Sequence, residues 1–245
     1  MGAQTGQTSK RTWVMPVAIL TLAALLIALV VVLVRGQQEQ EAAGESSPDD
    51  GPAAEVEVSE QPDLTSAERR DPDDLLAAGP VEAPVTLVVF SDYQCPYCAQ
   101  WSDETLPLMM ERVEAGDLRI EWRDVNIYGA PSERAARASY AAALQGSFWE
   151  YHDALFENGE KRSEAELDGE ALVALAGELG LDTEQFTADM DAEPTQAQIT
   201  ENAKLGLDLG AHSTPAFVMG GQPMVGAQPS QVFVDAFEQA LAAAE

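Results

Sequence analysis

The sequence has few of the residues that bind metal ions: two cysteines and two histidines among 245 residues. The histidines, His152 and His212, lie far apart and do not have the spacing of a zinc finger. A structural zinc ion takes about four ligands, and a copper-delivering pair of thiols is equally disfavoured. The sequence therefore predicts no metal site and no bound cofactor.

Positive charge is also scarce. Thirteen lysines and arginines face 42 aspartates and glutamates, and the formal net charge is −29. All of the acidic residues follow Gly36, and a surface this acidic excludes nucleic acid and anionic lipid as binding partners. A soluble acidic surface accounts for this composition. Adaptation to high salt, which would screen the self-repulsion, is the sharper alternative.

Charge is absent altogether from Trp13 to Val34, a run of 22 residues. At ~1.5 Å per residue, a helix of this length spans roughly 33 Å, enough to cross a hydrocarbon core of about 30 Å. Arg35-Gly36 follows the run, where a cleaved signal peptide would have an Ala-x-Ala-like site. The sequence thus predicts an uncleaved transmembrane anchor at 13–34, with a signal peptide as the alternative.

The charges that flank this anchor weakly favour one orientation. Lys10 and Arg11 precede it and Arg35 follows it, which favours a cytoplasmic location for residues 1–12. Everything after the anchor would then lie outside the cytoplasm. The predicted location is therefore the cell membrane, with a single pass and an extracytoplasmic C-terminal domain.

Aromatic residues are absent from residues 35–70, which are rich in Glu, Gln, Ser, Pro and Asp. Such a segment buries too little apolar surface to offset its ordering entropy. We expect a flexible acidic linker with a reach of roughly 30–35 Å. The folded domain is expected at 71–245.

The first half of this domain has an α/β pattern. The apolar run Val85–Phe90 predicts a buried central strand, and Pro96–Glu114 has apolar residues at helical spacing, with a kink expected at Pro107. Leu118–Val125 alternates apolar and polar residues, which predicts a strand with one face in water.

The second half turns helical and ends in a hairpin. Residues 132–209 predict several helices, which suggest a helical insertion into a small α/β fold. Ala216–Met219 predicts a strand, Gly220-Gly221 a turn, and Pro223–Val225 the returning strand. Ser230 is expected to cap a last helix whose inward residues are Val232, Phe233, Phe237 and Leu241.

The two cysteines fall together, as Cys95-Pro96-Tyr97-Cys98, between the first strand and its helix. This arrangement is typical of a thiol–disulfide redox site. With Pro96 at the first helical position, Cys95 would cap the helix, where free N–H groups and the helix dipole lower a thiol pKa from about 8.5. Cys98, one turn further on and expected to be more buried, would be the resolving cysteine. A structural disulfide is the plain alternative, although so small a loop gives little entropic stabilisation.

The remaining polar candidates have ordinary explanations. His152 lies in an aromatic stretch and is expected to be a packing or helix-surface residue rather than a catalytic base. Asp92 is expected to lie in the turn before the cysteines.

Two stretches together carry a family resemblance. The first runs from Phe90 to Cys98, and the second comprises Thr214-Pro215-Ala216-Phe217-Val218 followed by Gly226-Ala227-Gln228-Pro229. They resemble the DsbA-like family of thioredoxin-fold thiol–disulfide oxidoreductases, in a membrane-anchored bacterial form. Ala135–Ala138 and Gly146–His152 are similar to that family's helical insertion.

The resemblance implies a role for each motif residue. It makes Cys95 the nucleophile, Cys98 its partner, and Pro96 and Tyr97 the residues that shape the site. It also makes Pro215 a cis-proline beside the cysteines, with Thr214 presenting its backbone to an extended substrate peptide. A cis bond there would turn the Thr214 backbone toward the site, where a substrate strand could pair with it.

The activity expected is therefore protein thiol–disulfide exchange in the oxidising direction, which introduces disulfides into exported proteins. The resemblance implies a quinone-linked membrane partner that reoxidises the cysteines. A reductase or isomerase of the same fold remains an alternative, since the reduction potential sets the direction. So does a peptide-binding, chaperone-like module whose cysteines only lock the fold.

Overall fold

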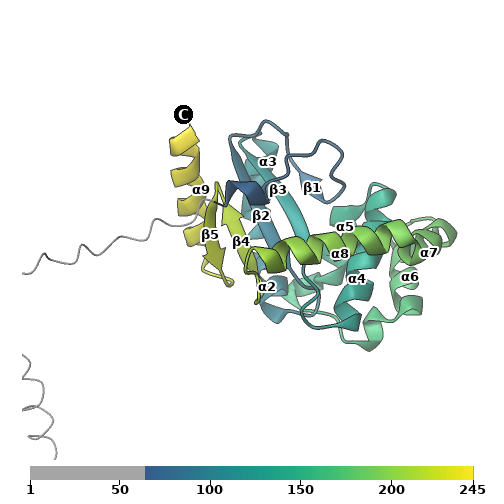
Figure 1. Ribbon diagram of the computed structural model, residues 1–245. Coiled ribbons are helices and arrows are strands. Elements are labelled where there is room, and N and C mark those ends of the chain that lie inside the picture. The colour runs from purple at the N-terminus through teal and green to yellow at the C-terminus, as the bar shows by residue number, and fades with distance from the viewer. Residues whose placement is uncertain (1–63, 245) are drawn as a thin grey trace, which may run out of the picture. The chain divides into compact units, whose positions relative to one another are not determined.

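The computed structural model of the protein describes residues 64–244 (Figure 1). The predicted anchor at 13–34 and most of the linker at 35–70 lie outside the described residues. Within the described part of the chain, no helix combines the length and the apolar character needed to cross a membrane.

A five-stranded mixed sheet forms the centre of the fold, in the order β1-β3-β2-β4-β5. The strands are β1 (Ala77–Ala78), β2 (Val85–Ser91), β3 (Leu118–Asp124), β4 (Ala216–Met219) and β5 (Gln222–Val225). β2 and β3 are parallel, whereas the other three pairs are antiparallel. β2 is fully buried in the middle of the sheet, as its unbroken apolar run predicts.

The helices lie before, between and after these strands. α2 and α3 connect β2 to β3, five α-helices and two 3-10 helices lie between β3 and β4, and α9 ends the described chain (Figure 1). Their bounds are α2 (Pro96–Glu104), α3 (Leu106–Glu114), α4 (Ala130–Leu144), α5 (Phe148–Leu155), α6 (Gly169–Glu178), α7 (Thr183–Asp191), α8 (Glu193–Asp208) and α9 (Ser230–Ala244). The block α4–α8 occupies the place of the expected helical insertion. Together with the mixed sheet it gives a thioredoxin-like α/β fold.

The core has one cluster on each face of the sheet, because successive strand residues point to opposite faces. The larger cluster joins Val89 and Trp122 to α2–α7 and α9. The smaller joins Phe90 and Val125 to α8 and to the segment that precedes β1. Gly206 of α8 permits this close packing, since a Cβ there would lie 2.3 Å from the Val125 side chain.

The prediction that β3 has one face in water is wrong: all seven residues of the strand are buried. Its polar residues form a network centred on Glu121, which accepts hydrogen bonds from the Nε of Arg119 at 2.9 Å and from Arg123 at 3.1 Å. Glu121 also accepts from the backbone N–H groups of Arg69 and Arg70. The segment before β1 therefore covers this face, and Glu121 satisfies its donors.

The same contacts correct the linker boundary. Thr65–Ala67 forms a 3-10 helix with Ala67 buried, and the Leu64 N–H donates to the carbonyl of Gly221 at 2.9 Å. Residues 64–70 therefore belong to the folded unit and are not the end of a flexible linker.

Three smaller expectations about helices also need correction. The predicted 96–114 helix is two helices that meet at Thr105, with Pro107 in the first turn of α3, where its missing N–H costs nothing. Val232 is exposed, although Phe233 and Phe237 are buried. The Ser230 hydroxyl bonds to Thr105 and to the Glu104 carbonyl, so it ties α9 to the α2–α3 junction.

Candidate active site

The cysteine motif lies where β2 ends and α2 begins. Cys95 is the N-cap of α2 and Pro96 is its first residue, as the sequence predicts. Tyr97 points outward, with 60% of its surface exposed. Both cysteines are free thiols in the structure. The turn thus places the Cys95 sulfur at the positive end of the helix.

Surface exposure does not separate the two cysteines, because both side chains are buried: Cys95 is 0% exposed and Cys98 is 1% exposed. Cys95 is covered because residues from elsewhere in the chain pack against its sulfur. Access by a substrate thiol therefore requires one of these covering groups to move.

The Thr214–Pro215 segment is one of the covering groups. The peptide bond between these residues is cis, and the Cys95 thiol donates a hydrogen bond to the Thr214 carbonyl at 3.2 Å. The fold thus brings the two separate sequence motifs into direct contact. The backbone of Thr214 faces the cysteines, as the resemblance implies.

The surroundings of the two sulfurs shift their pKa values in opposite directions. A hydrogen bond from Cys98, and others from the N–H groups of Cys98 and Tyr97, lower the pKa of Cys95 from 9.0 to about 6 against the effect of burial. Burial, together with the neighbouring Cys95, raises the pKa of Cys98 well above its usual value. Cys95 is therefore the thiolate near neutral pH, which is the form that exchanges.

Sequence reasoning left out two residues that complete the site. Asp92 is buried and accepts hydrogen bonds from the backbone N–H of Gln94 and of Tyr128. Burial and the nearby charge of Cys95 raise the pKa of the Tyr128 phenol. The bond from Gln94 to Asp92 is a local contact of the turn in which Asp92 was expected. The bond from Tyr128 depends on the loop after β3 lying beside the loop after β2, for which the sequence carries no local signal.

The structure confirms that His152 is a packing residue. It is fully buried among aromatic rings, with its Nδ1 atom 3.4 Å from the Tyr93 hydroxyl, and burial lowers its pKa to about 3. A group that stays neutral throughout the physiological range packs the core and does not act as a base at the cysteines.

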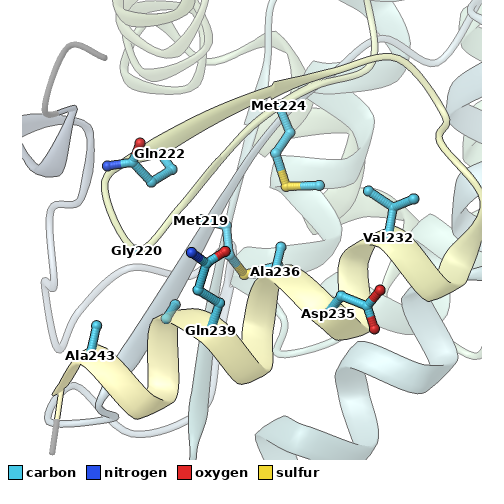
Figure 2. Close-up of a pocket in the computed structure, with 10 residues that line it drawn as sticks. Met219, Gly220, Gln222, Met224, Val232, Asp235, Ala236, Gln239 and Ala243 are labelled. Carbon is cyan, nitrogen blue, oxygen red and sulfur yellow. The ribbon is translucent and has the colours of Figure 1, made fainter. Parts of the chain in front are cut away.

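A pocket of about 610 Å³ lies apart from this site, between the β4–β5 hairpin and α9 (Figure 2). Met219, Met224 and Val232 line it. Met219 is at the far end of β4 from Pro215, about 13 Å away at the usual strand rise. This pocket is therefore not part of the cysteine site. Among residues 64–244, no group of three acidic, histidine or cysteine side chains could hold a metal ion.

A thioredoxin-like sheet, a Cys-x-x-Cys at a helix N-terminus and a cis-proline against the first cysteine define the class of thiol–disulfide oxidoreductases. A family model described as Thioredoxin matches residues 72–239. The chain belongs to this family, and the resemblance to its DsbA-like members is confirmed.

Solved structures support this assignment. A thioredoxin-like oxidoreductase from Silicibacter pomeroyi is 33% identical, with a TM-score of 0.57, and the match covers 69% of this chain and 98% of that one. Wolbachia pipientis alpha-DsbA1 has the same fold at 17% identity, with a TM-score of 0.62 over 71% of this chain and 94% of that one.

Curated relatives are of two kinds. Disulfide bond formation protein D of Bacillus subtilis is 29% identical over 145 residues, or 56% of this chain and 64% of that protein. A Na⁺/H⁺ antiporter of Herminiimonas arsenicoxydans is 34% identical over 164 residues, or 65% of this chain. The chain spans only 24% of that antiporter's length.

Proposed function

We propose that the protein is a membrane-anchored, extracytoplasmic dithiol oxidase that introduces disulfides into exported proteins. In the proposed cycle, Cys95 and Cys98 start as a disulfide. A substrate thiolate attacks the Cys95 sulfur, and Cys98 leaves and becomes a thiol. A second substrate thiolate then attacks the mixed disulfide, so the substrate leaves oxidised and Cys95 is released as a thiolate.

The observation that carries the proposal is the lowered pKa of Cys95. A drop from 9.0 to about 6 stabilises the reduced protein about tenfold at pH 7. At ~30 mV per tenfold, this makes the disulfide about 30 mV more oxidising. The effect favours the oxidase over the reductase. It covers only part of the range from about −270 to −120 mV that separates thioredoxin from the strongest oxidants.

The relatives support the same direction. One of them is a disulfide bond formation protein, and the chain matches more of its length than of the antiporters'. We infer that the shared segment of the antiporters is this thioredoxin-like domain. It carries no argument for ion transport by this chain.

Location and reoxidation belong to the same proposal. The uncharged run at 13–34 would anchor the protein, and the acidic linker would hold the domain away from the membrane. A quinone-linked membrane protein would return the cysteines to the disulfide. Protease added to intact spheroplasts should digest the domain; full protection would place it in the cytoplasm and refute the location.

The activity is tested by the reduction potential and by substitution of each cysteine. We expect a potential closer to −120 than to −270 mV, measured against glutathione. Cys95→Ser should abolish oxidation of a reduced, unfolded substrate. Cys98→Ser, mixed with a substrate that already holds a disulfide, should accumulate the mixed disulfide, because its Cys95 thiolate displaces one substrate sulfur and no Cys98 thiol is left to release the other. A potential near −270 mV would indicate a reductase. Full activity of Cys95→Ser would indicate a binding module.

A further inference from the structure

A short loop of the helical block lies against the cysteine motif. This loop, residues 159–163, continues from the 3-10 helix Glu157–Gly159, which packs on α2. A Cβ atom at Gly159 would lie only 3.1 Å from the Cβ of Asp103, a residue of α2. The loop is therefore in close contact with the helix that carries Cys98.

Gln94 joins this loop to the cysteine turn. It immediately precedes Cys95, it is buried, and its backbone N–H donates to Asp92 at 2.8 Å. Its side-chain Nε2 donates to the carbonyl of Arg162 at 2.8 Å, and its Oε1 accepts from the Nζ of Lys161 at 3.2 Å. Because the donor and the acceptor of this amide are both bonded, Gln94 holds the Lys161 ammonium beside the residue that precedes the reactive cysteine.

Within the described part of the chain, Lys161 is exposed and has no acidic partner. Every other lysine and arginine among residues 64–244 forms an ion pair, except Arg112, whose guanidinium lies over the Phe237 ring. In a sequence with 42 acidic and 13 basic residues, a lysine without a carboxylate is the exception. The neighbouring Arg162 guanidinium already donates to a backbone carbonyl of α5. The Lys161 ammonium is therefore free to bind an anionic group of another molecule.

We propose that Lys161 is a specificity-determining residue, which binds a carboxylate close to the reacting thiol of the substrate. Gln94 is the positioning residue that holds the ammonium at the cysteine turn. An extended peptide spans at most about 3.3–3.6 Å per residue, so an acidic residue within about three positions of the substrate cysteine covers roughly 10 Å. The substrate class is thus a thiol peptide with an acidic residue beside its cysteine. The acidic surface of the protein repels such a peptide, and a local cation offsets this repulsion at the site.

The contact acts when the substrate sulfur reaches Cys95. The substrate thiolate attacks the Cys95 sulfur, and the bond between Cys95 and Cys98 breaks. The electron pair of that bond leaves with Cys98, while a new bond joins the substrate sulfur to Cys95. By binding the nearby carboxylate, Lys161 brings the incoming sulfur close to Cys95, and it takes no part in the electron transfer. This role rests on the proposed exchange at Cys95 but not on its oxidising direction.

The test compares reduced glutathione with its diethyl ester, because esterification removes both carboxylates and keeps the thiol. Each thiol is mixed in excess with the oxidised full chain, and the rate of attack is followed by acid quench and mass spectrometry. In Lys161→Gln the glutathione rate should fall about twofold to fivefold, as expected for one exposed ion pair, and the ester rate should not fall. Lys161→Arg should keep the rate of the unmodified protein. In 1 M salt, where the Debye length is about 3 Å, the effect of Lys161→Gln should disappear.

Lys204→Gln is the matched control, since Lys204 is also exposed and its charge is paired with Asp208 of the same helix. This variant makes the same change in net charge and should leave both rates unchanged. An equal fall with glutathione and with the ester in Lys161→Gln would mean that Lys161 only supports the turn. An unchanged glutathione rate would mean that it binds no carboxylate, and either result would overturn the proposal. A protein that exchanges with neither thiol would refute the proposed function as well, so the two failures are distinct.

Discussion

The Cys95 thiol donates a 3.2 Å hydrogen bond to the carbonyl of Thr214, which lies 119 residues further along the chain. Only the protonated sulfur can make this bond, because a thiolate has no hydrogen to donate. Ionisation of Cys95 therefore leaves the carbonyl without that donor, and the N–H of an extended substrate is its natural replacement. The charge state of the Cys95 sulfur thus determines whether the Thr214 carbonyl is free to accept a hydrogen bond from a substrate peptide.

The first prediction concerns selective alkylation of the reduced protein. Iodoacetamide should modify Cys95 with a midpoint near pH 6, because its pKa is lowered to about 6, and should leave Cys98 unmodified because burial raises its pKa. The plateau rate should be below that of a free cysteine, since Cys95 is fully covered. Peptide mapping by mass spectrometry identifies the modified residue. Equal labelling of both cysteines near neutral pH would contradict the assignment.

A second prediction links pH to stability in the reduced state. The Cys95 pKa is lower in the folded protein than in the unfolded chain. Its contribution is therefore complete above about pH 9 and is lost as the pH falls toward 6. Between pH 6 and 8, the free energy of unfolding of the reduced protein should rise by about 1–2 kcal/mol relative to the oxidised protein. Urea denaturation of both forms at each pH measures the difference, and parallel profiles would argue against it.

The third prediction concerns the buried network on β3. Glu121→Gln should destabilise the protein by about 3–5 kcal/mol, because it leaves the buried guanidinium of Arg119 without its carboxylate and leaves Arg123 with Asp74 alone. Glu201→Gln is the control, since Glu201 pairs with Arg69 at the surface, where such a pair contributes about 0–1 kcal/mol. Urea midpoints compare the two variants. Similar losses of stability in the two variants would mean that burial of the network does not contribute to the stability of the protein.

The features of the fold and of the site that could be predicted are those determined by residues close together in the sequence. The buried strand at β2, the cap at Cys95 and the helix start at Pro96 follow from neighbouring residues, and the structure has all three. The contact between Thr214 and Cys95 was predicted only from the family resemblance, because no residue near Thr214 in the sequence indicates it.

What the sequence could not predict are contacts set by tertiary register. Arg119, Glu121 and Arg123 have the alternation of a wet face, and only the chain segment that crosses β3 buries them. Likewise, Tyr128 becomes a neighbour of Cys95 only because β2 and β3 pair in parallel with Ser91 opposite Asp124. Local pattern cannot reveal which strands pair or in what register.

The last prediction concerns Asp124, a fully buried carboxyl at the end of β3. Its Oδ1 atom accepts from the indole N–H of Trp122 at 3.1 Å, and its Oδ2 atom has no hydrogen-bond partner. Burial, aided by the nearby Asp92, raises its pKa to about 8. The folded protein therefore keeps Asp124 protonated near neutral pH, whereas the unfolded chain ionises it. The contribution of Asp124 therefore lowers the free energy of unfolding more and more as the pH rises from about 4 to 8.

Asp124→Asn should remove this cost, because the amide is neutral at every pH and can still accept from Trp122. The variant should therefore gain stability over the unmodified protein as the pH rises from 4 to 8, on the order of a few kcal/mol. Asp235→Asn is the control, since it makes the same substitution at an exposed residue of α9. Oxidised protein should be used for both, so that the cysteines do not titrate. A stability difference between Asp124→Asn and the unmodified protein that is constant over this range would show that Asp124 is ionised in the fold.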